Sequence, residues 1–221
     1  MAKWKKAAQK AIADIVHRGK VPIICGGTGF WIDALVYDQS LPDVRPDAKL
    51  RARLQKLTPA QLFARLEKLD PVRAATIDRH NPVRLIRALE IVMTTGRPVP
   101  KQSFHSPYEV LYLVLSPKKE LAKRIERRLD TRLKHGMLSE VKKLHASGVS
   151  WKKSELFGLE YRRLARYLQH KITRTEMRES LLHDIIAYSK RQITWFKRNK
   201  SALWITSPTR AMRLARQFLS E

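Results

Sequence analysis

Residues 21–30 read VPIICGGTGF, and this stretch decides the class of the fold. The apolar run Val21–Cys25, bounded by glycines, is typical of a buried parallel strand. A helical pattern follows over Phe30–Tyr37. Strand, glycine turn and helix together predict an α/β layer with a site at the carboxyl end of the strand.

The turn between strand and helix carries the first candidate site residues. Gly26 and Gly27 leave backbone N–H groups uncovered and Thr28 adds a hydroxyl, which suits a phosphate. Glycines also serve merely to turn a chain tightly, so this alternative stays open. The turn is not a Walker A loop, because the one Gly-Lys pair, Gly19-Lys20, is not followed by Ser or Thr.

Outward from this segment the periodicity is mostly helical. Helical patterns cover residues 3–18, 46–57, 59–69, a short piece after Pro71, 82–95, 118–135, 138–146, 161–169, 173–199 and a terminal segment from Pro208. Two further apolar runs, Glu109–Ser116 and Leu203–Thr206, are predicted as strands. We expect an α/β core over 1–43, an inserted all-helical subdomain over 44–103, and the second part of the core over 104–221.

The charge of the chain points to a polyanionic partner. Lysines and arginines number 45 against 20 acidic residues, a formal net charge of +25, and they are spread over the whole of the 221 residues. Dispersed cations that neutralise phosphates are typical of nucleic-acid binding. An inert, solvated basic surface is the alternative.

Cysteine and histidine usage excludes several kinds of site. Cys25 is the only cysteine, which leaves no disulfide framework and no thiolate zinc site, and we expect it to be a small core residue. The seven histidines form no metal-binding motif, so no metal site is predicted. No apolar run approaches the length of a membrane span, and we expect a cytoplasmic protein without a membrane partner.

Arginines recur at one-turn spacing in the helix predicted over 118–135. Arg124, Arg128 and Arg132 share one face, which suits a diphosphate or an RNA backbone. The alternative is a solvated face with Glu126 and Asp130 nearby.

Two other helices carry candidate RNA-binding cations. Arg84 and Arg87 lie three residues apart in the helix over 82–95, where a salt bridge between Arg87 and Glu90 is the alternative. In the last long helix, Lys190 and Arg191 are interleaved with aromatic residues, a pattern that favours RNA contact by charge and stacking. Because apolar residues also recur along this helix, the aromatic residues are more typical of a core.

Four segments in order along the chain resemble the tRNA dimethylallyltransferases. They read VPIICGGTGF (21–30), DRHNPVRLIRALEI (78–91), RIERRLDTRLKHGMLSEV (124–141) and YSKRQITWF (188–196). The resemblance implies a P-loop-NTPase-like core that is incomplete here, with an inserted helical subdomain that grips the tRNA anticodon arm. It implies transfer of a dimethylallyl group from dimethylallyl diphosphate to the N6 amine of the adenosine 3′-adjacent to the anticodon, with the base flipped out. Mg²⁺ is the implied cofactor, although no protein ligand for it is identifiable in the sequence.

The resemblance also implies roles for individual residues. Thr28 and Arg128 are the implied catalytic residues, Thr28 near the target base and Arg128 on the diphosphate, which Gly26, Gly27 and Arg124 are also expected to bind. The implied tRNA-binding residues, beside Thr28, Lys190 and Arg191, are Arg51, Val83, Arg84, Leu85, Ile86, Arg87, Phe157, Gly158, Leu159, Glu160, Tyr161 and Arg162. In the run FGLEYR (157–162) residues separate Gly158 from Tyr161, where the family has Gly-Tyr-Lys/Arg.

Two motifs of the family do not occur before Met1: a Gly-Pro-Thr-Ala-Ser-Gly-Lys-like loop and an Asp-Ser-x-Gln-x-Tyr segment that supplies the general base. We therefore expect an N-terminally truncated member with impaired catalysis. A non-enzymatic RNA-binding module derived from that enzyme is the alternative, and a P-loop kinase relative is a third. Intact members are expected to be monomers, and this chain to self-associate through an exposed sheet edge.

Overall fold

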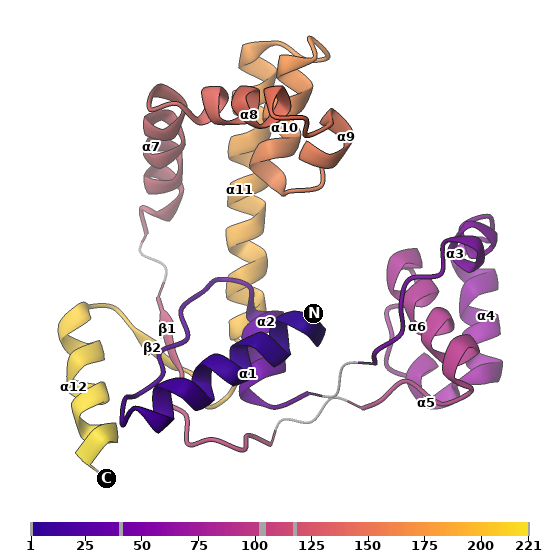
Figure 1. The fold of residues 1–221 in the computed structure, drawn as a ribbon, viewed down its shortest axis with the longest axis horizontal. Helices are drawn as coiled ribbons and strands as arrows, with labels where there is room; N and C mark the ends of the chain where they lie inside the picture. The colour runs from indigo at the N-terminus through magenta and orange to yellow at the C-terminus, as the bar shows by residue number, and fades with distance from the viewer. Residues whose placement is uncertain (1, 40–41, 102–104, 117–118, 221) are drawn as a thin grey trace. The chain divides into compact units, whose positions relative to one another are not determined.

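The computed structural model describes residues 2–39, 42–101, 105–116 and 119–220, whose helices and strands are drawn in Figure 1. The chain divides into two units, residues 1–110 and 111–221. The predicted division into 1–43, 44–103 and 104–221 stays a prediction. Each unit is described here by itself.

The first unit begins with two packed helices, α1 (Ala2–His17) and α2 (Gly29–Val36). Trp4 meets Trp31 edge to face with ring centroids 4.7 Å apart. The Nζ of Lys5 lies 2.7 Å from Asp38 Oδ1 beyond the end of α2. An aromatic pair and an ion pair therefore fix α1 on α2.

The strand predicted over Val21–Cys25 is wrong. These residues adopt no regular structure, Ile23 is 88% exposed, and Cys25 is exposed and not a core residue. An extended segment becomes a strand only when a neighbour satisfies its backbone groups. In the parts of the chain that the structure describes, no strand lies beside this segment.

Residues 48–95 form a small helical subdomain whose helix ends match the sequence signals. Its helices are α3 (Ala48–Leu54), α4 (Pro59–Leu69), α5 (Pro71–Ala74) and α6 (Pro82–Thr95). Asn81 caps α6 by accepting a hydrogen bond from the Arg84 N–H, and Gly96 ends it in the left-handed region at φ 65°. The core of the subdomain consists of Leu50, Leu54, Leu62, Leu66, Ala74, Ile77, Leu85, Ala88, Leu89 and Val92. This core is drawn entirely from the predicted insertion.

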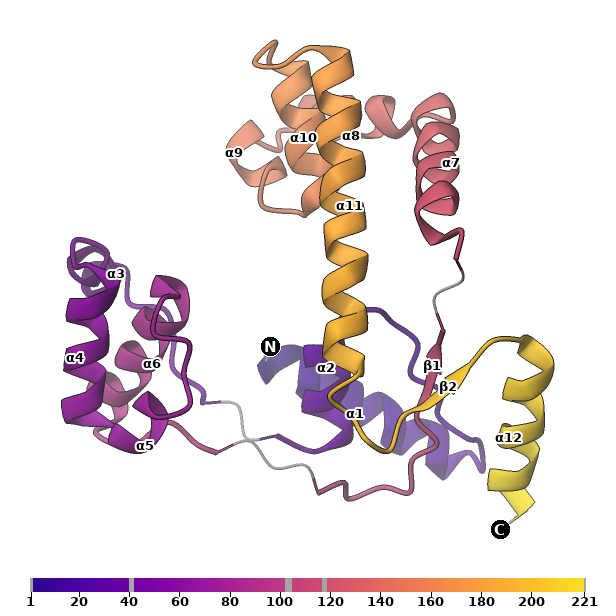
Figure 2. The ribbon, with the colours of Figure 1, turned by 180° about the vertical axis from the view of Figure 1, so that it is seen from behind.

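The second unit is built around the long helix α11 (Arg174–Phe196), which begins with the predicted capping box of Thr173 and Glu176 (Figure 2). Around it lie α7 (Leu121–Lys134), α8 (Met137–Ala146), α9 (Trp151–Ser154) and α10 (Leu159–Leu168). Their shared core consists of Leu129, Met137, Val141, Leu164, Met177 and Leu181. The short helix α9 has no counterpart among the predicted elements.

Ion pairs fasten two of these helices to α11. Arg178 of α11 binds Asp130 through two hydrogen bonds of 2.7 Å and also reaches Glu126 at 3.0 Å, both on α7. These bonds raise the pKa of Arg178. Arg163 of α10 donates to Asp184 of α11 at 2.7 Å. The positions of α7 and α10 against α11 are therefore set by charge as well as by apolar packing.

A short parallel sheet completes the second unit. β1 (Leu113–Leu115) pairs with β2 (Leu203–Ile205), with Val114 opposite Trp204, and α12 (Pro208–Ser220) follows. Both strands fall within the runs predicted from the sequence, although β1 is shorter than Glu109–Ser116. Over the described residues the chain is thus helix-rich with a small parallel sheet.

Among the described residues, no helix is both long enough and apolar enough to span a membrane.

Candidate functional site

A pocket of about 620 Å³ opens on the second unit between α7, α10 and α11. Its lining residues are Leu121, Ile125, Arg128, Leu129, Arg132, Phe157, Gly158, Leu159, Glu160, Tyr161, Ile185, Tyr188, Ser189 and Gln192. Apolar side chains form much of the wall, and cationic, hydroxyl and amide groups share it. A size and lining of this kind suit a small ligand with an apolar part and an anionic part.

The structure distinguishes the three arginines on α7. Arg132 is paired with Glu160 across the pocket wall. Arg128 also lines the pocket, and its exposed side chain has no acidic partner among the residues that the structure describes. Arg124 is exposed and lies outside the pocket lining. Of the three, Arg128 therefore combines pocket position with an uncompensated charge.

Glu126 and Asp130 do not neutralise Arg128. Both carboxylates bind Arg178 on the side of α7 that packs against α11. The hydrogen bond from Arg178 lowers the pKa of Asp130, so the pair remains ionised. Neither of these two acids therefore pairs with Arg128, whose side chain is exposed.

The segment Phe157–Arg162 contributes most of its predicted residues to the same pocket. Leu159, Glu160 and Tyr161 line the pocket from the first turn of α10. The Tyr161 hydroxyl donates a hydrogen bond to Glu140, which raises the pKa of Tyr161. Arg162 instead donates from Nε to the Glu155 carbonyl at 3.3 Å and is not part of the lining.

Gly158 gives this segment its shape. Its φ of 145° with ψ of −174° is a backbone conformation that essentially only glycine adopts. We expect Gly158→Ala to lower the free energy of unfolding by about 1–3 kcal/mol, because the new Cβ strains the backbone. Urea unfolding of the two proteins measures this change. Gly26→Ala is the control, since a Cβ there meets only the Ile32 Cδ1 at an ordinary 3.9 Å, and an equal loss in both variants would contradict the prediction.

The basic residues of α11 lie beside the pocket rather than in it. Lys190 and Arg191 are exposed, and the Arg191 guanidinium carbon lies 5.7 Å from the centre of the Tyr188 ring. Tyr188 itself lines the pocket and is half-buried, so it is not a core residue. Ser189 and Gln192 were not predicted as site residues. They stand on the same face of α11 as Ile185 at helical spacing, which is a signal the sequence does contain.

The glycine turn belongs to the first unit. Thr28 precedes α2 and its carbonyl accepts a hydrogen bond of 2.9 Å from the Trp31 N–H. Gly26 and Thr28 are exposed and Gly27 is half-buried. The turn therefore lies largely at the surface, although the strand before it did not form, and its role in binding stays a prediction.

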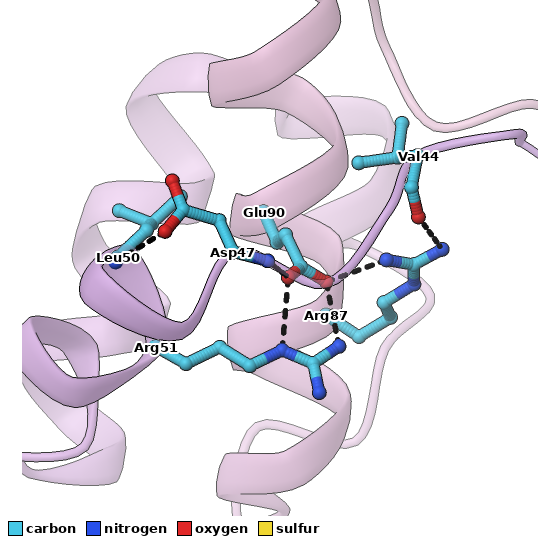
Figure 3. A network of polar contacts seen from close by, with 6 residues as sticks. All are labelled: Val44, Asp47, Leu50, Arg51, Arg87 and Glu90. Atoms are coloured by element: carbon cyan, nitrogen blue, oxygen red, sulfur yellow. Dashed lines mark hydrogen bonds and ion pairs between the residues drawn. The ribbon is translucent and has the colours of Figure 1, made fainter.

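A second polar site lies in the helical subdomain, where Arg51 and Arg87 share the carboxylate of Glu90 (Figure 3). Arg51 donates from Nε to Oε1 and from Nη2 to Oε2, both at 2.8 Å. Arg87 donates to Oε2 as well and also binds the Val44 carbonyl at 3.1 Å. The Asp47 N–H donates to Oε1 at 2.8 Å. The alternative given for Arg87, a salt bridge with Glu90, is therefore confirmed, and sequence reasoning missed that Glu90 also holds Arg51.

Burial and hydrogen bonding act in opposite directions on Glu90. Its side chain is 0% exposed, and burial alone would raise the pKa of the carboxyl. Hydrogen bonds from Arg51, Arg87 and the Asp47 N–H outweigh the burial and lower the pKa of Glu90 to about 2. The carboxylate is thus charged at neutral pH although no solvent reaches it.

This lowered pKa predicts acid sensitivity. A depressed folded-state pKa stabilises the protein above the ordinary value of 4.5, and the stabilisation is lost as the pH falls towards 2. We expect Glu90 to contribute about 3 kcal/mol to the free energy of unfolding at pH 7 that is lost by pH 2. Urea unfolding between pH 7 and pH 2 measures it. The exposed Glu67→Gln variant should keep the wild-type pH dependence and Glu90→Gln should lose this part, so identical profiles for the two variants would contradict the assignment.

The segment 83–87 divides into exposed and buried residues. Val83 is 75% exposed and Arg84 is exposed, so both are accessible to a partner. Leu85 is fully buried and Ile86 packs against the same core. The Leu85 side chain therefore faces the core of the subdomain, because α6 turns that position inward, and the tRNA contact of this segment stays a prediction.

Among the described residues no group of three or more His, Cys, Asp or Glu side chains could hold a metal ion. These side chains do not fit a Mg²⁺ site, and the magnesium implied by the resemblance stays a prediction.

Comparison with known proteins gives one consistent family. A family model described as IPP transferase matches residues 1–199. The tRNA dimethylallyltransferase of Thermomicrobium roseum is 35% identical over 217 residues, covering 94% of this chain and 66% of the relative. The enzyme of the same name from a Roseiflexus species is 36% identical, covering 98% and 73%. The chain thus spans about two thirds of the length of these relatives.

Solved structures agree with the sequence relatives. The full-length tRNA isopentenylpyrophosphate transferase of Bacillus halodurans superposes with a TM-score of 0.66 at 29% identity, over 99% of this chain and 72% of that one. A eukaryotic dimethylallyltransferase acting on tRNA gives a TM-score of 0.77 at 23% identity, a likeness of fold alone.

Proposed function

The chain belongs to the IPP transferase family, and on this premise we propose that it takes part in the prenylation of tRNA. The proposed reaction transfers a dimethylallyl group from dimethylallyl diphosphate to the N6 amine of the adenosine 3′-adjacent to the anticodon. The C–O bond to the diphosphate breaks and the N6–C bond forms. Inorganic diphosphate leaves, and the amine loses one proton to the solvent. A P-loop-like core, to which the described sheet contributes, is part of the proposal.

The pocket of the second unit is the observation that carries the proposal. Dimethylallyl diphosphate is apolar at one end and strongly anionic at the other. The pocket offers both kinds of wall, with Leu121 and Ile125 as apolar residues and Arg128 as a cation without an acidic partner among the described residues. Arg128 would bind the diphosphate and stabilise the charge that develops on it as the C–O bond breaks.

Thr28 and the helical subdomain are proposed to act on the tRNA. Thr28 presents a surface hydroxyl beside the glycine turn, suited to a flipped-out base. Arg51, Arg84 and Arg87 present guanidinium groups on the subdomain, and a net charge of +25 favours a phosphate backbone.

The experiment combines the purified chain with unmodified tRNA and dimethylallyl diphosphate. Mass spectrometry of the digested nucleosides detects N6-dimethylallyl adenosine, and a filter assay measures tRNA binding in the same samples. We expect tRNA binding together with slow formation of product, because the catalysis of this chain is proposed to be impaired. Binding without product over many hours would instead support an RNA-binding module, and neither binding nor product would overturn the proposal.

A further inference from the structure

The Glu90 carboxylate pairs with two arginines, Arg51 and Arg87, although a single cation would balance its charge. Both Arg51 and Arg87 donate to the same oxygen, Oε2, which brings their guanidinium nitrogens to within a few ångströms of each other (Figure 3). Two like charges at this separation repel unless an anion lies between them. The buried carboxylate supplies that anion from the inner side only.

The outer side of the two guanidinium groups remains accessible. Their side chains are 38% and 37% exposed, whereas Glu90 is 0% exposed. The carboxylate of Asp47, the other nearby acid in this cluster, accepts a hydrogen bond from the Leu50 N–H and is directed at the start of α3 (Figure 3). It therefore serves the helix end and does not cover the arginines.

Counting donors shows what this arrangement leaves for a ligand. A guanidinium carries five N–H donors. Arg51 donates two hydrogen bonds to Glu90. Arg87 donates one to Glu90 and one to the Val44 carbonyl. Each arginine thus keeps three donors beyond these bonds, and the third nitrogen of Arg51 points away from Glu90 (Figure 3). A phosphate, with several acceptor oxygens and a negative charge, matches such a pair of donors.

We propose that Glu90 is a positioning residue, which holds Arg51 and Arg87 side by side so that their remaining donors bind a single phosphate of an RNA backbone. The inference rests on the proposed tRNA binding and goes beyond it by assigning a role to a buried acid that cannot touch RNA. Without the carboxylate, both long side chains would lose their common acceptor and sample many rotamers, so phosphate binding would have to order them again.

The sign of the effect of Glu90→Gln on tRNA affinity tests the proposal. If only the net charge mattered, Glu90→Gln would bind tRNA more tightly, because the variant removes a negative charge from a protein that binds a polyanion. If Glu90 positions the arginines, Glu90→Gln should bind tRNA about tenfold more weakly than the wild type. The slope of log affinity against log salt concentration should also be smaller by about one. Glu67→Gln is the matched control, since it removes the same charge from an exposed position of the same subdomain, and it should bind as tightly as the wild type or slightly tighter.

The same substitution in a variant that lacks both arginines distinguishes a positioning role of Glu90 from a role in folding stability alone. In the Arg51→Ala/Arg87→Ala protein, Glu90→Gln should no longer weaken tRNA binding, because Glu90 acts through these arginines. A structural role would weaken it in both backgrounds. Should circular dichroism show that Glu90→Gln does not fold, Arg51→Lys provides the test, since it keeps the charge but cannot bind Glu90 through two parallel bonds, and a loss of about fivefold is expected.

Two results would overturn the inference. Wild-type affinity or tighter binding in folded Glu90→Gln, or in Arg51→Lys if that variant is needed, would refute positioning while leaving the proposed function intact. A wild-type chain that does not bind tRNA would refute both.

Discussion

Arg128→Ala is expected to weaken the binding of dimethylallyl diphosphate by about 10- to 100-fold. The side chain lines the pocket and has no acidic partner within the described part of the chain, so its charge is available to the diphosphate. A hydrogen bond to a charged group contributes roughly 1.5–3 kcal/mol, and each 1.4 kcal/mol is tenfold in affinity. Isothermal titration calorimetry measures the dissociation constant directly and does not depend on turnover.

Two neighbouring arginines on α7 provide the comparison. Arg127→Ala removes an exposed cation one residue away that does not line the pocket, and Arg124→Ala tests the residue predicted from helical spacing. Both should change the affinity by less than about threefold, because exposed charges at a distance are screened. Equal losses in all three variants would show that the ligand responds to the overall charge of α7 and not to Arg128.

Leu89→Ala is expected to lower the free energy of unfolding of the helical subdomain by about 2–5 kcal/mol. Leu89 is 0% exposed in the core shared by the subdomain's helices, so truncation removes buried apolar surface and leaves a cavity. Urea unfolding followed by circular dichroism measures the loss. Binding of tRNA should weaken in parallel at temperatures where the subdomain begins to unfold, since Arg51 and Arg87 are positioned by that fold.

Met93→Ala is the control on the same helix, one turn further along. Its side chain is 49% exposed, and we expect a change of less than about 1 kcal/mol. If Leu89→Ala were no more destabilising than Met93→Ala, the subdomain would not depend on the core described here.

The pocket of the second unit and the arginine pair of the helical subdomain suit different anionic ligands. The pocket of the second unit combines apolar walls with Arg128, which suits a small molecule that is only partly polar. The helical subdomain instead presents guanidinium groups at its surface, which suits a backbone of repeated phosphates. Each unit thus carries the kind of surface that one of the two proposed substrates requires.

Helix ends were predictable because the signals that set them are local. Asn81 and Gly96 bound α6, and Thr173 with Glu176 begins α11, as expected from the sequence. A cap satisfies backbone groups within the same turn, so nothing distant in the chain can alter it. For the same reason the helices of residues 48–95 were predictable, and their core residues lie at helical spacing.

Contacts between distant segments were not predictable in the same way. The run Val21–Cys25 has the composition of a strand, but its residues have no strand beside them among those described, and Ile23 is exposed. Composition states how well a segment suits a sheet, whereas pairing depends on a neighbour from elsewhere in the chain. A single-sequence pattern contains no information about that neighbour.

The sequence by itself determined the helical subdomain, the helix caps, the basic character and the set of arginines from which the sites are built. Only the tertiary structure decided which of them are available. In the folded protein Arg132 pairs with Glu160, and both Glu126 and Asp130 pair with Arg178. Arg128 lines the pocket. Spacing places side chains on one face of a helix, but the partners that neutralise a charge come from other helices, and packing alone brings them within hydrogen-bonding distance.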